Sequence, residues 1–106
     1  MEQMSFAEFA ASVAAQDAKP PEKLSTPLRA LWYDARDDWS AAHGLAQEDS
    51  SASGSWVHAY LHRKEGDTSN AGYWYARAGR PRVGEETPLR VEWEQIAREL
   101  LGDVKK

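Results

Sequence analysis

Cysteine is absent from all 106 positions of this sequence. Its absence excludes disulfides, thiolate metal ligands and cysteine nucleophiles, and it suits a reducing compartment. The first residues lack a basic start followed by an apolar core, so we expect no secretory signal. No apolar run approaches the length that is needed to cross a bilayer. We therefore expect a cytoplasmic protein that has no membrane partner.

Positive charge is also scarce, because 13 lysines and arginines stand against 17 aspartates and glutamates. Nucleic-acid binding needs clustered cations that displace counterions, so a net charge of −4 argues against a nucleic-acid partner. The hydrophobic content of 42% is that of an ordinary globular chain, and five tryptophans can supply large buried areas. The length suits one domain, because two halves would each be too small to bury a core.

Apolar residues recur at helical spacing in six segments, and no segment alternates convincingly with the period of a strand. The pattern predicts helices over about residues 6–17, 26–37, 38–47, 56–65, 68–78 and 88–101. Most of these segments begin at a residue that can cap a helix: the expected N-caps are Ser5, Thr26, Asp38, Ser55 and Thr87, and Asp67 to Ser69 supply the start signal of the fifth segment. Pro20-Pro21 and Gly79 supply stop signals. The sequence thus predicts a single all-α domain.

The middle four helices are predicted to form two antiparallel hairpins. Residues 1–25 are then an N-terminal helix with a proline-rich connector, 26–82 a repeat-like core, and 83–106 a C-terminal helix. A shift of 29 residues lays Asp38 on Asp67 and Ala42 on Ala71. The spacing of small and aromatic residues resembles the tetratricopeptide repeat and its Sel1-like relatives, which implies closely packed helix pairs. Unrelated hairpins with the same close packing are the alternative interpretation.

The longest specific motif covers residues 58–81 and reads H-A-Y-L-H-R-K-E-G-D-T-S-N-A-G-Y-W-Y-A-R-A-G-R-P. Together with D-D-W-S-A-A-H at residues 37–43, it resembles a family of short microbial and fungal proteins. The resemblance spans about residues 28–82. No activity is established for that family, so the resemblance implies relatives and no particular function.

His58 and His62 stand one turn apart on the same predicted helix, a spacing that lets two imidazoles face one metal ion. The glutamate base of the H-E-x-x-H signature is absent. Alternatively, both histidines border the core and hydrogen-bond to their neighbours. Apolar residues cover most of this helix, so we expect the two histidines at an interface or groove wall. A third metal ligand would come from His43, Asp38, Glu65 or Asp67.

The next predicted helix places Asn70, Tyr73 and Arg77 on one face, opposite its apolar stripe. An exposed tyrosine beside an amide and a guanidinium suits a carboxylate or a peptide. An ordinary solvated face is the alternative. No serine stands in a nucleophile-elbow context, and no paired carboxylates indicate acid–base catalysis.

We therefore predict a non-enzymatic binding or scaffold module that needs no cofactor. It would hold a peptide or a small anionic ligand with His58, His62, Asn70, Tyr73 and Arg77. The alternative hypothesis is a divalent-metal site on His58 and His62, with His43 as a third ligand, that could be hydrolytic. A homodimer that buries some of the aromatic side chains is a third hypothesis.

Overall fold

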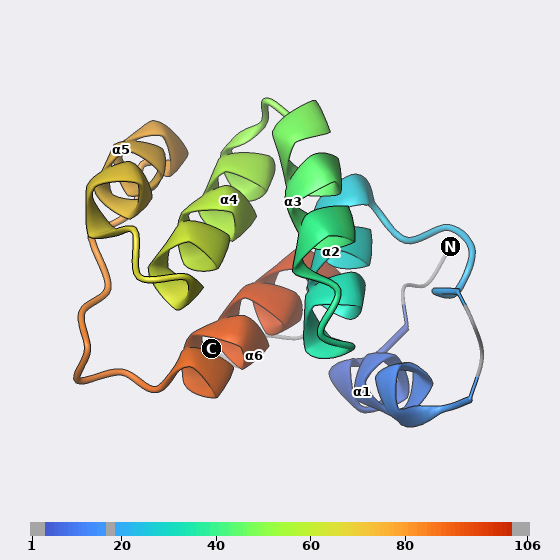
Figure 1. The fold of residues 1–106 in the computed structure, drawn as a ribbon. Helices are drawn as coiled ribbons and strands as arrows, with labels where there is room; N and C mark the ends of the chain where they lie inside the picture. The colour runs from blue at the N-terminus through green and yellow to red at the C-terminus, as the bar shows by residue number, and fades with distance from the viewer. Residues whose placement is uncertain (1–3, 17–18, 103–106) are drawn as a thin grey trace.

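The computed structural model describes residues 4–16 and 19–102. Every regular element in these residues is a helix, which confirms the predicted all-α class (Figure 1). The helices are α1 (Phe6–Ala14), α2 (Thr26–Ala35), α3 (Trp39–Glu48), α4 (Ala52–Lys64), α5 (Thr68–Ala78) and α6 (Leu89–Leu101). None of the helices in these residues combines the length and the apolar character that crossing a bilayer requires.

The helices pair as the sequence predicts. The helix pairs α2–α3 and α4–α5 each pack closely as a hairpin, with the short turns 36–38 and 65–67 between their members. The two hairpins meet where α3 packs against α4, so α4 lies between α3 and α5 (Figure 1). The C-terminal helix α6 packs against α4 and α2, and α1 packs against α6. Helix α4 is therefore the central element of the fold.

Side-chain caps determine where several helices begin. The hydroxyl of Ser5 accepts a hydrogen bond from the amide of Glu8, and the Glu8 carboxylate accepts one from the Ser5 amide, as the predicted capping box requires. Asp38 and Asp67 cap α3 and α5 through amides three residues further on. Gly79 ends α5 with a φ of 70°, a left-handed conformation that costs glycine little. These four signals were predicted correctly.

The start of α4 was predicted wrongly. The helix begins at Ala52 and its N-cap is Ser51, whose hydroxyl accepts a hydrogen bond from the amide of Gly54. Ser55, the expected cap, lies inside the helix and is buried. The polar composition of residues 48–54 indicates a loop, but residues 52–54 form the first turn of α4, which Ser51 caps and which lies close to Asp49.

Three smaller boundaries also differ from the prediction. Ser25 rather than Thr26 caps α2, because Thr26 already has a helical conformation. Pro88 rather than Thr87 precedes α6, and it makes no side-chain capping bond. The first helix ends at Ala14, before the predicted end at residue 17, which lies outside the described residues.

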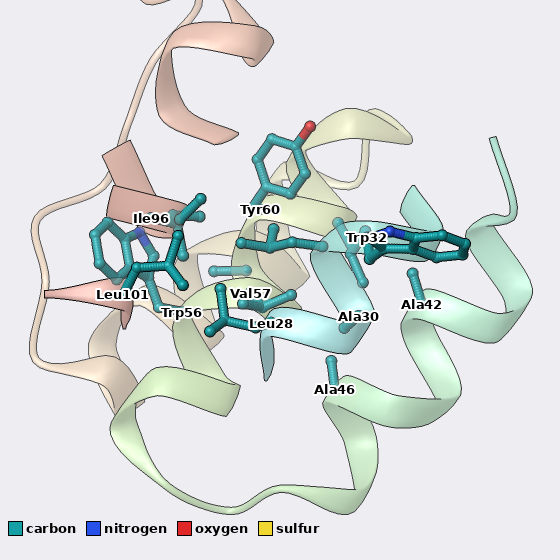
Figure 2. Close-up of a cluster of buried hydrophobic side chains, with 14 of the residues drawn as sticks. Leu28, Ala30, Trp32, Ala42, Ala46, Trp56, Val57, Tyr60, Ile96 and Leu101 are labelled. Carbon is teal, nitrogen blue, oxygen red and sulfur yellow. The ribbon is translucent and has the colours of Figure 1, made fainter. Parts of the chain in front are cut away.

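The hydrophobic core is built around α4. All residues from 54 to 61 in this helix are buried. Val57 and Trp56 pack among apolar side chains of α2 and α6, including Leu28 and Ile96 (Figure 2). Small residues such as Ala42 face the same core and allow α3 to approach closely. The burial of α4 on several sides holds its polar side chains in defined positions.

A buried carboxylate joins the last three helices. Glu92 of α6 is 0% exposed and accepts hydrogen bonds from the Trp56 indole at 3.3 Å and from the Tyr75 hydroxyl at 2.7 and 2.9 Å. Arg63 forms an ion pair with it at 3.0 Å and also donates to the carbonyls of Gly84 and Thr87. Burial and the adjacent carboxylate raise the pKa of Tyr75, so its hydroxyl stays protonated. A buried charge is tolerated only with such partners.

The same substitution at two glycines should have opposite effects on stability. Gly44→Ala in α3 adds a methyl group that meets no other atom. It should raise the free energy of unfolding by about 0.5–1 kcal/mol, because alanine favours a helix more than glycine does. Gly54→Ala in α4 drives the methyl group into the Asp49 backbone. This substitution should lower the free energy of unfolding by roughly 1–3 kcal/mol.

Urea denaturation followed by circular dichroism measures both changes. Equal stabilisation by the two substitutions would contradict the close approach of α4 to the preceding turn.

Candidate functional site

Three histidines converge between α3 and α4. Helix α4 presents His58 and His62 on one face, because four residues make about one turn. The packing of α3 against α4 adds His43, whose Nε2 lies 3.0 Å from Nε2 of His58. One nitrogen of each ring lies within 4.8 Å of one nitrogen of the other two rings. The structure thus brings together the three residues of the metal hypothesis.

Two tryptophans hold these imidazoles in place. The ring of His43 stacks on Trp39, with ring centroids 4.6 Å apart, and the ring of His58 stacks on Trp74 at 3.9 Å. The Trp39 indole donates a hydrogen bond to the carbonyl of Leu61 at 3.3 Å, which ties its ring to α4. The orientation of the cluster is therefore built into the packing of α3, α4 and α5. Neither tryptophan was among the predicted site residues, although Trp39 precedes His43 by one helical turn.

Two of the three rings in the histidine cluster, those of His43 and His58, favour the uncharged form. Burial, together with the smaller effects of the neighbouring His43 and His62, lowers the pKa of His58 to about 4. Burial and His62 also lower the pKa of His43, against a smaller opposing effect of Glu65. At neutral pH, His43 and His58 are therefore neutral imidazoles. This is the protonation state that binds metal ions.

The polar groups of the cluster are not all satisfied. His58 is 3% exposed, and its Nδ1 has no hydrogen-bond partner among the described residues. Nε2 of His58 and Nε2 of His43 form one hydrogen bond, in which only one of the two nitrogens carries a proton. A buried polar atom without a partner costs about 1–3 kcal/mol, and it is unusual enough to call for an explanation. The cluster is therefore not optimised for stability alone.

His62 connects the cluster to two carboxylates in the turn between α4 and α5. Its Nδ1 lies 2.9 Å from Glu65 Oε1 and 3.9 Å from Asp67 Oδ2. Hydrogen bonds from Asn70 lower the pKa of Asp67, so this carboxylate is ionised at neutral pH. His62, Glu65 and Asp67 form a second group whose ligand atoms lie within 4.8 Å of one another.

The other three residues of the predicted binding surface lie on the outer face of α5. Asn70, Tyr73 and Arg77 are all exposed, and Tyr73 is 54% exposed. The Arg77 guanidinium donates a hydrogen bond to the Tyr73 hydroxyl at 3.3 Å and lies over the rings of Tyr73 and Trp74. Asn70 is held by Asp67 through a 2.7 Å hydrogen bond. These side chains form a defined surface that is open to solvent.

The five predicted binding residues therefore divide into a buried pair and an exposed trio. His58 and the 12% exposed His62 belong to the interior cluster, whereas the α5 trio faces outward. Trp74 contacts both groups, because it stacks on His58 and also lies under Arg77.

A pocket of about 440 Å³ lies elsewhere, between α1, α2, α4 and α6. Its wall includes Asp34, a buried carboxylate that accepts hydrogen bonds from the Tyr60 hydroxyl at 3.1 Å and from the Lys64 ammonium at 2.8 Å. The pocket is otherwise mainly apolar, with Trp93 at one side. Asp34, Tyr60 and Lys64 are already paired with one another, and we assign no ligand to the pocket.

No protein-family model, curated protein or solved structure matches this chain. The family resemblance of residues 58–81 and the tetratricopeptide-like pattern stay predictions. The functional argument therefore depends on the geometry alone.

The lowered pKa of His58 should make the metal-free protein less stable in mild acid. Unfolded His58 binds a proton near its ordinary pKa of 6.5, whereas folded His58 does so only near 4. The unfolded state therefore binds more protons as the pH falls through this window. This difference should remove about 2 kcal/mol of stability between about pH 7.5 and about pH 4.5.

The substitution His58→Phe keeps a ring against Trp74 and should abolish this part of the pH dependence. Urea denaturation of wild type and variant at about pH 7.5 and about pH 4.5, with a chelator present, measures the change in stability with pH. A stability difference between wild type and variant that is the same at both pH values would contradict the lowered pKa.

Proposed function

We propose that this protein binds a divalent transition-metal ion through His43, His58 and His62. The observation that carries the proposal is the convergence of these three imidazoles, whose ligand nitrogens lie within 4.8 Å of one another. In a tetrahedral zinc site with bonds of about 2.0–2.1 Å, the ligand atoms lie about 3.3 Å apart. Small rotations of the rings would therefore bring all three nitrogens to one ion.

The donor set favours particular metals. Imidazole nitrogens suit zinc, copper, nickel and iron, whereas calcium and magnesium prefer oxygen ligands. Three histidines also leave one tetrahedral position to water, as in catalytic zinc sites. The proposed site therefore has the ligand composition of a hydrolytic centre, and the function that we propose for it is metal binding.

Metal binding should be visible in both stoichiometry and thermal stability. Purified wild-type protein should retain about one equivalent of zinc, and zinc at roughly 100 times its Kd should stabilise the fold by about 2.7 kcal/mol. For a domain of this size, that corresponds to a rise in Tm of about 10 °C or more. His58→Phe and His43→Asn should lose both effects, because each removes one ligand nitrogen.

Gln47→Ala provides the matched control, since Gln47 is an exposed residue one turn after His43 on α3. Differential scanning fluorimetry and metal analysis measure the two quantities. If zinc, copper, nickel and cobalt all leave the Tm unchanged and none is retained, the proposal is rejected.

A second candidate function is the capture of a carboxylate or an acidic peptide by the outer face of α5. The specific observation is the state of Arg77, whose guanidinium donates a hydrogen bond to the hydroxyl of Tyr73. None of the carboxylates in the described residues forms an ion pair with it. Its remaining donors can accept a planar carboxylate in a bidentate arrangement, while Tyr73 supplies apolar contact area. This function would make the protein a non-enzymatic binding or scaffold module.

Substitutions on α5 should separate this second function from metal binding. Tyr73→Ala and Arg77→Ala should each weaken the binding of an acidic peptide about tenfold or more, since both are typical anchor residues. Zinc binding and helicity should stay unchanged in both variants. Arg90→Ala, at an exposed arginine on α6, is the control. Titrations followed by NMR would detect the binding, and equal affinity in all four proteins would reject this location.

A further inference from the structure

His62 is the histidine of the cluster that also contacts carboxylates. Of the two nearby carboxylates, only Glu65 lies within hydrogen-bond distance of Nδ1, at 2.9 Å, whereas Asp67 lies at 3.9 Å. Glu65 follows His62 by three residues, so both side chains lie on the same face at the end of α4. Because an ionised carboxylate can only accept hydrogen bonds, Nδ1 of His62 must carry the proton in this pair.

The two carboxylates have different roles in the local structure. Asp67 is the N-cap of α5, where one oxygen accepts from the backbone amide of Asn70 and the other from the Asn70 side chain. Both of its oxygens are therefore committed to the start of α5. The Glu65 carboxylate has His62 as its hydrogen-bond partner among the described residues. Glu65 is thus the carboxylate that is available to orient the imidazole.

The proton on Nδ1 determines which nitrogen of His62 can bind an ion. A neutral imidazole carries one proton, so the hydrogen bond to Glu65 leaves the lone pair on Nε2. Metal-bound histidines commonly donate their second N–H to a carboxylate in this way, and loss of that partner weakens metal binding 10- to 100-fold.

We infer that Glu65 is a positioning residue for the metal site, which holds His62 in the tautomer whose Nε2 completes the three-histidine ligand set. The inference rests on the proposed metal-binding function. It assigns the role to Glu65 and not to Asp67, although both carboxylates lie close to His62.

Three substitutions test this assignment. Glu65→Ala removes the acceptor, Glu65→Gln keeps an acceptor oxygen without the charge, and Asp67→Asn keeps a good N-cap. Long-range ¹H–¹⁵N NMR of the metal-free proteins distinguishes the two tautomers of His62. Zinc titration in competition with a chelator then gives the affinity and the number of ions bound.

We expect the Nδ1–H tautomer of His62 in wild type, Glu65→Gln and Asp67→Asn, and a shift of the proton toward Nε2 in Glu65→Ala. The affinity for zinc should fall about 10- to 100-fold in Glu65→Ala, less in Glu65→Gln, and hardly at all in Asp67→Asn. A purely structural role of Glu65 would leave the tautomer unchanged.

Two results would overturn the inference. One is an unchanged tautomer and affinity in Glu65→Ala. The other is a second equivalent of zinc in wild type that is lost in Glu65→Ala, since Glu65 would then be a ligand of its own ion with His62 and Asp67. The absence of zinc binding in every protein would instead reject the proposed function, and the tautomer of His62 would still show whether Glu65 orients this ring.

Discussion

The carboxylate of Glu92 lies fully buried among three helices, and the geometry of the molecule depends on how it is neutralised. Trp56, Arg63 and Tyr75 all donate to it, so α4 and α5 are aligned with α6 at a single point. An unpaired charge in this position would cost several kcal/mol, so the three donors must arrive together. Arg63 extends the same network to the segment between α5 and α6.

This alignment bears directly on the candidate site, because α4 carries two of the three donors to Glu92 and two of the three histidines. Trp56 and Arg63 face α6, whereas His58 and His62 meet His43 of α3. The helix thus has a polar network on two of its sides, within an otherwise apolar environment. Packing of this kind restricts side chains to single conformations, which is what a metal site requires of its ligands.

Helix α5 relates the two candidate functions to each other. Its Trp74 stacks on His58, and the same residue lies beneath Arg77 of the exposed trio. The inward face of α5 therefore supports the histidine cluster, and its outward face presents Tyr73 and Arg77 to solvent. Asp67 at its start holds Asn70 and approaches His62. Metal binding and ligand capture would use neighbouring parts of α3, α4 and α5 without competing for the same side chains.

The sequence by itself determined the helices, several of their ends and the placement of His58 and His62 on one face, because periodicity and capping are local properties. The start of α4 was missed because Ser51 and Ser55 are both serines that can cap a helix, and the structure shows that Ser51 does so, with Gly54 close to Asp49. Only the tertiary structure decided that His43 joins the other two histidines and that Glu92 collects its donors. These partners are separated by 15 to 36 residues along the chain, and no local pattern encodes which of them meet. Their meeting depends on the crossing of whole helices, which the core determines collectively.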